Sequence, residues 1–494
     1  MILINEREKM KSEINLTMLT DFYEFTMMNG FLNEGYKDRI AYFDMFYRHV
    51  PDNGGFAIMA GIDQMIEYIK EIEFTEKDIE FLRSKGIFCE EFLDYLRNFR
   101  FECDVWAIPE GTPIFPGEPI VTVRGPVIQA QLVETMILLT INHQSLIATK
   151  ANRIVRAAQG RTVMEFGSRR AQGYTGATIG ARAAYIGGVH GTACTISDEI
   201  YGIKAMGTMA HSWVQLFDSE YEAFKAYART YPDGCTLLVD TYNVLKSGMP
   251  NAIKVFDEVL KPLGKRPAGV RIDSGDITYL SKKCRKMLDE AGYSDCKIVA
   301  SNSLDEYIIR DMLLQGAKID SFGVGERLIT SKSEPVFGGV YKLVAVENEN
   351  GEIVPKIKIS ENVAKITTPG FKQVHRLYSR KDSSALADVI TIHGEKIDDS
   401  KPYTIFDPDH TWKKKTVTDF YVRELLKPVF VKGECVYESP SVEVLREYCK
   451  MEVDGLWEEV KRFENPHTYY VDLSKDLWEL KQRMLEEYQN QEIK

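Results

Sequence analysis

The chain has 494 residues, 44% of them hydrophobic, so it can bury a large core and its length predicts two to four domains. Its formal net charge of −11 argues against a general nucleic-acid-binding surface, which needs an excess of basic residues, but it does not exclude a local basic pocket. The eight cysteines form no CxxC pair, so we expect reduced thiols and no zinc site. No apolar run approaches the length of a membrane span, and residues 1–16 are too charged for a signal peptide, so we expect a cytoplasmic protein with no membrane partner.

The first 138 residues predict a mixed α+β domain. Residues 17–32 are apolar enough to start a helix, and the run AYFDMFYRHVP that follows alternates aromatic and polar residues as a strand does. Residues 76–98 predict a helix, and residues 101–126 contain short β-prone runs that are separated by proline and glycine turns. A long helix with apolar periodicity then ends at Gly160, and we place the domain boundary near its start.

From Arg161 onward, apolar β-branched runs end in polar or glycine residues, and most are followed by a helical segment. The runs are RTVMEF before GSRRAQG, AMGTMA before His211, TLLV before Asp240, GVRI before Asp273, KIVA before Ser301 and KIDSFGV before Gly325. Alternating strands and helices predict a parallel sheet. Polar residues at the carboxyl ends of its strands favour a (β/α) barrel over residues 139–340, although an open doubly wound sheet would also bind ligands at that edge.

The remaining chain returns to a β pattern. Strands from residues 340–375 are expected to complete the N-terminal domain, and residues 385–494 predict a separate mixed segment. Its last helix should begin after Ser474, which is a suitable N-cap. A lid, an interface and a scaffold are all possible roles for this segment.

The residues at the strand ends predict an anion site. Arginine forks match the oxygens of carboxylates and phosphates, glycines let backbone N–H groups approach an anion, and carboxylates beside a polyphosphate suit Mg²⁺. The candidates are Arg169, Arg170, Arg271, Ser301, Asn302, Gly323, Gly325, Asp273 and Asp276. Each alone has an ordinary structural explanation, such as a solvated face, a helix cap or a tight turn. Their joint occurrence favours an enzyme that acts on a phosphorylated, anionic substrate with Mg²⁺.

Six motifs resemble those of the nicotinate phosphoribosyltransferase family: TDFYEFTM, EFGSRRAQG, GTMAHS, VDTYNV, VRIDSGD and AKITTPGFK. The resemblance extends from Thr20 to the C-terminal tail. It implies an irregular α/β barrel of the type II phosphoribosyltransferase kind, with a split β-rich N-terminal domain and a C-terminal extension. It also implies transfer of phosphoribosyl from phosphoribosyl pyrophosphate to nicotinate, coupled to ATP hydrolysis through a phosphohistidine, in a homodimer whose active sites lie at the subunit interface.

The resemblance also implies roles for individual residues. His211 would carry the phosphate, Asp240 would orient its ring, and Asp273 would face the ribose hydroxyls or Mg²⁺. Around nicotinate the contacts would be Tyr23 (supplied by the partner subunit), Thr208 and Arg271, and Arg169 would face the base and the phosphate. The 5-phosphate would be held by Ser301, Asn302, Gly323 and Gly325, and Thr367 would contact phosphoribosyl pyrophosphate. Lys365 and Lys372 on the same loop are weaker candidates.

Four other functions were weighed against this one. Nicotinamide phosphoribosyltransferases carry an aspartate in a GTDT turn, where this chain has Ala193, and an alanine removes both an amide acceptor and the repulsion of a carboxylate. Quinolinate phosphoribosyltransferases are far shorter and lack the ATP step. A catalytically silent barrel would be expected to lose His211, Asp240 or an arginine. A metal hydrolase would need histidine ligands near DSGD, which are absent from the sequence around it.

Overall fold

The computed structural model describes residues 15–362 and 365–492, so most of the charged N-terminal stretch considered above lies outside it. The chain folds as two compact units: Met1–Leu146 together with Val336–Lys494, and Ile147–Pro335. Helix α7 (Glu134–Ala157) continues across the first boundary. Among the residues described, no helix combines the length and the apolar character needed to cross a membrane.

The unit Ile147–Pro335 is built on a five-stranded parallel sheet in the order β6-β10-β9-β8-β7. Its strands are β6 (Thr162–Glu165), β7 (Thr236–Leu238), β8 (Gly269–Ile272), β9 (Lys297–Asn302) and β10 (Ser321–Val324). Two isolated parallel bridges, Glu165–Thr192 and Thr192–Ala205, extend the sheet beyond β6. These segments form the wall of the predicted irregular barrel, and the predicted α/β class is confirmed.

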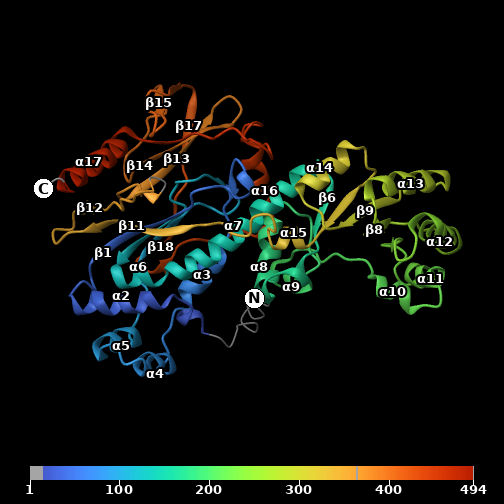
Figure 1. Ribbon diagram of the computed structural model, residues 1–494, viewed down its shortest axis with the longest axis horizontal. Helices are drawn as coiled ribbons and strands as arrows, with labels where there is room; N and C mark the ends of the chain where they lie inside the picture. Colours follow the sequence, from blue (N-terminus) through green and yellow to red (C-terminus); the bar gives the residue numbers. More distant parts are fainter. Residues whose placement is uncertain (1–14, 363–364, 493–494) are drawn as a thin grey trace. The chain divides into compact units, whose positions relative to one another are not determined.

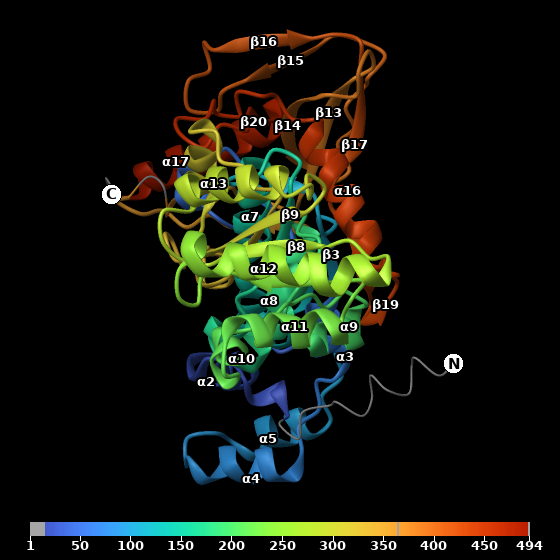
Figure 2. The same ribbon diagram turned by 90° about the vertical axis from the view of Figure 1, so that its right-hand side faces the viewer.

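Helices connect these strands, as the alternating pattern predicts. They are α8 (Gly173–Ile186), α9 (Thr195–Tyr201), α10 (His211–Leu216), α11 (Glu220–Thr230), α12 (Met249–Val255), α13 (Ile277–Glu290), α14 (Glu306–Leu314) and α15 (Glu326–Ile329). Helix α13 contacts both β8 and β9, and Figure 2 shows it with α12 in front of these strands. The side chains of Val163, Ile298 and Phe322 are fully buried, as expected for the sheet face that helices cover.

The run AMGTMA does not form the predicted strand. Ala205 makes a single bridge, and the Met206 N–H donates to the Thr192 carbonyl at 2.8 Å, but the following residues have no ladder partner. The run therefore becomes an extended loop that leads into α10, whose first residue is His211.

The other unit contains a seven-stranded antiparallel sheet in the order β12-β11-β1-β5-β3-β18-β19. Figure 1 labels β12, β11, β1 and β18 of this sheet. Its strands are β1 (Ile40–Phe46), β3 (Asp104–Ala107), β5 (Val121–Pro126), β11 (Val340–Glu347), β12 (Ile353–Pro355), β18 (Lys427–Val431) and β19 (Glu434–Cys435). Strands from three distant parts of the chain thus share one sheet, and β18 and β19 come from the stretch for which a separate segment was expected.

Smaller sheets and helices complete this unit. A four-stranded sheet has the order β17-β13-β14-β20, and β15 pairs with β16 in a hairpin (Figure 2). These strands are β13 (Lys372–Ser379), β14 (Ala385–Ile392), β15 (Tyr403–Phe406), β16 (Lys414–Val417), β17 (Phe420–Glu424) and β20 (Val471–Leu473), while β2 (Ala57–Ile58) pairs with β4 (Pro113–Ile114). The helices are α2 (Phe22–Asn33), α3 (Ile62–Lys70), α4 (Glu76–Ser84), α5 (Glu90–Arg97), α6 (Val127–Leu132), α16 (Val442–Asp454) and α17 (Lys475–Glu492).

Two helix predictions have different outcomes. Residues 76–98 form two helices, α4 and α5, because Gly86 between them has a φ of +69°, which ends the first helix. The predicted start of the last helix is confirmed, since the Ser474 hydroxyl accepts the Leu477 N–H at 3.4 Å and Leu477 is fully buried.

A buried ion pair joins β13 to β14. Arg376 and Asp388 are paired residues of the two strands, both are fully buried, and the guanidinium donates to both carboxylate oxygens at 2.8 and 2.6 Å. Arg376 also donates to the Pro113 carbonyl at 2.8 Å, and the Tyr469 hydroxyl donates to Asp388 at 3.1 Å. Removing one charge would therefore leave the other buried without compensation.

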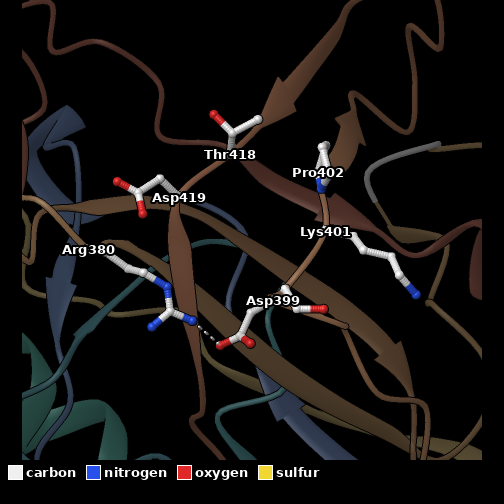
Figure 3. A pocket seen from close by; sticks show the side chains of 7 residues that line it. Arg380, Asp399, Lys401, Pro402, Thr418 and Asp419 are labelled. Atoms are coloured by element: carbon white, nitrogen blue, oxygen red, sulfur yellow. Dashed lines mark ion pairs between the residues drawn. The ribbon is translucent and has the colours of Figure 1, made fainter.

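We predict that Arg376→Met lowers the free energy of unfolding by about 3–5 kcal/mol, because Asp388 would remain buried and unpaired. Arg380→Met is the matched control, since the Arg380–Asp399 ion pair (3.1 Å, Figure 3) leaves 48% of the arginine side chain exposed and should contribute only about 0–1 kcal/mol. Urea unfolding followed by tryptophan fluorescence measures both. Equal shifts for the two variants would contradict the prediction.

Candidate active site

Most of the predicted site residues lie at the carboxyl ends of the parallel strands of the unit Ile147–Pro335. Arg169 follows β6, Asp240 follows β7, and Arg271 and Asp273 lie at the end of β8. Ser301 and Asn302 end β9, and Gly323 and Gly325 lie at the end of β10. Thr208 lies in the loop that begins at Met206, and His211 is the first residue of the helix after it. Since all of these strands run in the same direction, the polar side chains reach one face of the barrel.

The Arg271 guanidinium holds the centre of this face. It donates to the Ser301 hydroxyl at 2.9 Å, to the Thr208 hydroxyl at 2.9 Å and to the Met209 carbonyl at 3.2 Å. The Asp273 carboxylate lies 3.6 Å from it and accepts the Ser301 hydroxyl proton. Arg271 therefore links two strands to the loop before His211.

His211 lies between a hydroxyl and a carboxylate. Its Nδ1 is 3.1 Å from the Thr241 hydroxyl, and its Nε2 is 3.6 Å from Asp273 Oδ2. Its side chain is 40% exposed, so one edge of the ring is open to an incoming group. The ring is thus oriented from both nitrogens and remains accessible.

No hydrogen bond or ion pair joins Asp240 to His211 in the described part of the chain. Its Oδ2 accepts the Asp273 N–H at 3.1 Å and the Ser274 hydroxyl at 2.6 Å, so Asp240 fixes the loop that carries Asp273. Its Oδ1 is buried and has no hydrogen-bond partner. The carboxylate beside the imidazole is that of Asp273, which the spacing of the sequence motifs could not distinguish from Asp240.

The remaining anion candidates differ in their surroundings. Arg169 and Arg170 are exposed in a 3-10 turn and form no ion pair within the described part of the chain. Gly323 has no room for a side chain, because a Cβ there would lie 2.4 Å from the Phe166 ring. Gly325 would meet the Phe166 carbonyl at 3.1 Å. Close packing against Phe166 therefore explains Gly323 even without a bound phosphate.

Asn302 is held in a strained conformation at the end of β9. Its φ is +120°, a region that non-glycine residues rarely adopt, and its side-chain oxygen accepts the Ser303 N–H at 2.7 Å. Backbone strain of this kind persists where the surrounding structure enforces it, and it concentrates at functional sites. Asn302 thus has a fixed orientation beside Ser301.

Sequence reasoning missed Glu165 and Thr241 as parts of the site, although both lie in quoted motifs. The buried Glu165 carboxylate accepts the Gly167 N–H and, at 2.7 Å, the Thr192 hydroxyl. Burial raises the pKa of Glu165. The Glu165 carbonyl accepts the Ala193 N–H at 2.8 Å, so this residue joins the turn that carries Arg169 to the turn that carries Ala193.

Tyr23 and its neighbours lie in the other unit. Tyr23 is 46% exposed on α2, and partial burial together with Glu134 and Glu24 raises its pKa. Glu24 is fully buried, and burial, reinforced by Glu134, raises its pKa to about 7. Tyr23 is thus an accessible ring that adjoins a buried carboxyl group.

The predicted contacts on the loop before β13 are mostly internal. Thr367 is buried and accepts the Lys358 N–H at 2.9 Å. Lys372 is buried against Asp44 at 2.8 Å and donates to the Thr368 and Gly370 carbonyls, while burial lowers its pKa. Lys365 is exposed. Lys372 therefore holds the loop in place, and its ammonium group is not presented to solvent.

A surface hollow of about 360 Å³ lies near the β15–β16 hairpin (Figure 3). Arg380, Lys401, Asp399 and Asp419 line it, so its charges are mixed. It contains none of the predicted site residues, and the barrel face remains the candidate active site.

The described residues contain no group of three or more His, Cys, Asp or Glu side chains arranged to hold a metal ion. A Mg²⁺ that takes most of its ligands from a substrate and water needs fewer protein groups. The unpartnered Asp240 Oδ1 beside the Asp273 loop is an acceptor of the required kind.

An α/β barrel with cationic and histidine side chains at its carboxyl face defines a class of enzymes that bind anionic substrates. Comparison with known proteins specifies the family. Models of the nicotinate phosphoribosyltransferase (NAPRTase) N-terminal domain, family and C-terminal domain match residues 18–142, 162–399 and 371–481. The chain belongs to the nicotinate phosphoribosyltransferase family, as the motifs predicted.

Individual relatives agree with this assignment. A nicotinate phosphoribosyltransferase of Bacillus subtilis is 42% identical over 475 residues, which is 96% of each chain. The crystal structure of human nicotinic acid phosphoribosyltransferase has a TM-score of 0.83 at 28% identity and covers 94% of this chain and 99% of that chain. A nicotinate-nucleotide pyrophosphorylase structure from Pyrococcus furiosus has a TM-score of 0.69 at 25% identity and covers 90% and 97%.

We predict that Asn302→Ala destabilises the protein more than Asn302→Gly does. Both variants lose the side-chain acceptor, but glycine adopts a φ of +120° without steric cost, whereas alanine retains strain of about 1–3 kcal/mol. Unfolding free energies of the two variants measure the difference. A more stable alanine variant would contradict the strain argument.

We predict that Glu24 makes a contribution to stability that is lost as pH rises from about 4.5 to about 7, because burial raises the pKa of its carboxyl group in the folded state. The folded state holds this proton more tightly than the unfolded chain does, so deprotonation favours unfolding. Glu24→Gln should therefore raise the unfolding midpoint at pH 8 relative to the wild type and change it less at pH 4.5. Glu34→Gln, at an exposed carboxylate, is the control. A shift for Glu24→Gln that is equal at both pH values would contradict the assignment.

Proposed function

We propose that the chain transfers phosphoribosyl from phosphoribosyl pyrophosphate to nicotinate, giving nicotinate mononucleotide and pyrophosphate in NAD salvage. We propose further that the transfer is coupled to ATP hydrolysis through a phosphate on His211. The observation that carries the proposal is the Arg271 guanidinium, which lies beside Thr208 and Asp273 on the face that also presents His211. Membership of the family and the name of the Bacillus subtilis relative support the choice of substrate.

Arg271 and Thr208 suit the carboxylate of nicotinate. A guanidinium offers planar paired donors that match a carboxylate, and the Thr208 hydroxyl can reorient to donate as well. Ala193, on the exposed turn that Glu165 fixes, presents no acceptor for an amide and no charge that repels a carboxylate. An aromatic ring such as Tyr23 of a second subunit would stack on the pyridine.

The transfer breaks the bond between C1 of the ribose and the pyrophosphate oxygen and forms a bond from the pyridine nitrogen to C1. Positive charge develops on the sugar while negative charge develops on pyrophosphate, so cations at the leaving group lower the barrier. Arg169 and Arg170 are unpaired cations on the same face, and Ser301 and Asn302 are donors for the 5-phosphate. The Asp273 carboxylate is suited to the ribose hydroxyls.

The imidazole of His211 is suited to accept a phosphoryl group. One ring nitrogen attacks the γ-phosphorus of ATP, ADP leaves, and water later hydrolyses the phosphohistidine. With phosphate on Nδ1, Nε2 would carry the proton, and Asp273 at 3.6 Å would stabilise the resulting charge. Asp240 would support this step indirectly, through the Asp273 N–H.

Mg²⁺ would bind at Asp240 and Asp273 together with the substrate oxygens. When bound, it would neutralise charge on the pyrophosphate leaving group. Without Mg²⁺, the two carboxylates would repel the negatively charged phosphates. Either a bound cation or the neighbouring Arg271 would have to offset this repulsion.

We also propose a homodimer, in a cytoplasmic enzyme, whose active sites are completed by α2 of the partner. Helix α2 presents Phe22, Tyr23 and Met27 as exposed apolar side chains, and Leu16 and Leu19 before it are also exposed. Exposed apolar patches of this kind commonly mark interfaces.

The direct test is formation of mononucleotide from phosphoribosyl pyrophosphate and Mg²⁺ with nicotinate or nicotinamide, with and without ATP. We expect nicotinate to be used and ATP to stimulate its use. His211→Ala should abolish the stimulation and leave some uncoupled transfer, while His410→Ala, at an exposed histidine of the other unit, should behave as wild type. Preference for nicotinamide would contradict the interpretation of Ala193, and ATP stimulation of His211→Ala would contradict the phosphohistidine.

A further inference from the structure

The interior of the barrel contains a cavity of about 760 Å³. At one end it is lined by residues that precede or begin the strands, among them Gly234, Ala268 and Lys297. At the other end it is lined by Thr208 and Arg271. The cavity thus extends from the amino ends of the strands to the residues proposed to hold a carboxylate.

The cavity exists because small side chains occupy part of the barrel interior. Large branched side chains usually fill the interior of a (β/α) barrel in layers. Here Met164 and Val299 line the cavity, but Thr162, Thr236 and Ser321 line it as well and are partly accessible. Small hydroxyl side chains leave the interior open and able to hydrogen-bond to a polar ligand.

The lining carries a positive charge in an acidic protein. Arg161 and Lys297 lie at the amino end and Arg271 at the inner end, while Asp320 is the single carboxylate in the lining. Asp320 lies 3.5 Å from Lys297, whose side chain is 64% exposed. A cleft lined by one sign of charge raises the local concentration of small ions of the opposite sign.

We propose that this cavity is an entry channel for a small aromatic carboxylate, which passes from the amino ends of the strands to Arg271. The proposal rests on the proposed function, for which this carboxylate is nicotinate. Phosphoribosyl pyrophosphate and ATP occupy the carboxyl face of the barrel, and the channel gives nicotinate a separate route to the same site. Nicotinate can then bind while phosphoribosyl pyrophosphate or ATP occupies the carboxyl face of the barrel.

The first test closes the channel after folding. Gly234 is exposed, has an ordinary φ, and a Cβ built on it would have no atom within 4 Å, so Gly234→Cys should fold normally. A bulky maleimide on this cysteine should remove most of kcat/KM for nicotinate and leave the KM for phosphoribosyl pyrophosphate unchanged. The control is Lys286→Cys, on the exposed side of α13, labelled with the same maleimide. Because both variants contain the same native cysteines, the control accounts for any labelling of those residues.

The second test changes the charge at the mouth. Lys297→Glu should lower kcat/KM for nicotinate severalfold at low salt, and the loss should shrink as ionic strength screens the charge. Lys286→Glu controls for net charge. A purely structural effect of Lys297→Glu would not depend on salt in this way.

The outcomes separate the two proposals. If the wild type uses nicotinate but labelling of Gly234→Cys leaves its kcat/KM unchanged, the channel is wrong and the proposed function stands. If the wild type forms no nicotinate mononucleotide, both are overturned. Loss of nicotinate use on labelling, with the KM for phosphoribosyl pyrophosphate unchanged, supports the channel.

Discussion

The hydrogen bonds of Arg271 are the constraint on which the candidate site depends. One guanidinium joins β8 to Ser301 at the end of β9 and to Thr208 in the loop before α10. Its charge is balanced by Asp273, which in turn faces His211. Because a guanidinium has fixed planar geometry, these contacts position the three segments together. The proposed carboxylate site and the proposed phosphohistidine therefore share one structural support.

The same strands serve two purposes because their two faces differ in polarity. Fully buried side chains such as Val270, Ile298 and Phe322 form the apolar face. The opposite face lines the barrel interior with hydroxyl and charged side chains beside the apolar Met164 and Val299. The outer face thus packs against the helices, and the inner face carries polar groups of the candidate site. This division explains how the barrel interior can hold a cavity without loss of the core.

Local patterns predicted much of the fold, whereas contacts between distant segments were beyond them. The alternation of apolar runs and helices predicted five parallel strands that form, polar residues at the strand ends pointed to Arg271 and Asp273, and the family resemblance pointed to His211. The pattern failed at AMGTMA, where a strand needs a ladder partner that periodicity does not reveal. It also could not show that Asp240 bonds to the Asp273 loop or that Lys372 is buried against Asp44, since both depend on tertiary packing.

The most direct test of this account is calorimetric titration of nicotinate into the wild type and Arg271→Lys, each without phosphoribosyl pyrophosphate, so that binding is measured without turnover. Lysine keeps the charge but cannot supply the planar fork, so the account predicts at least about tenfold weaker nicotinate binding, or about 1.4 kcal/mol. Equal nicotinate affinity in the two proteins would contradict the assignment of the carboxylate site to Arg271.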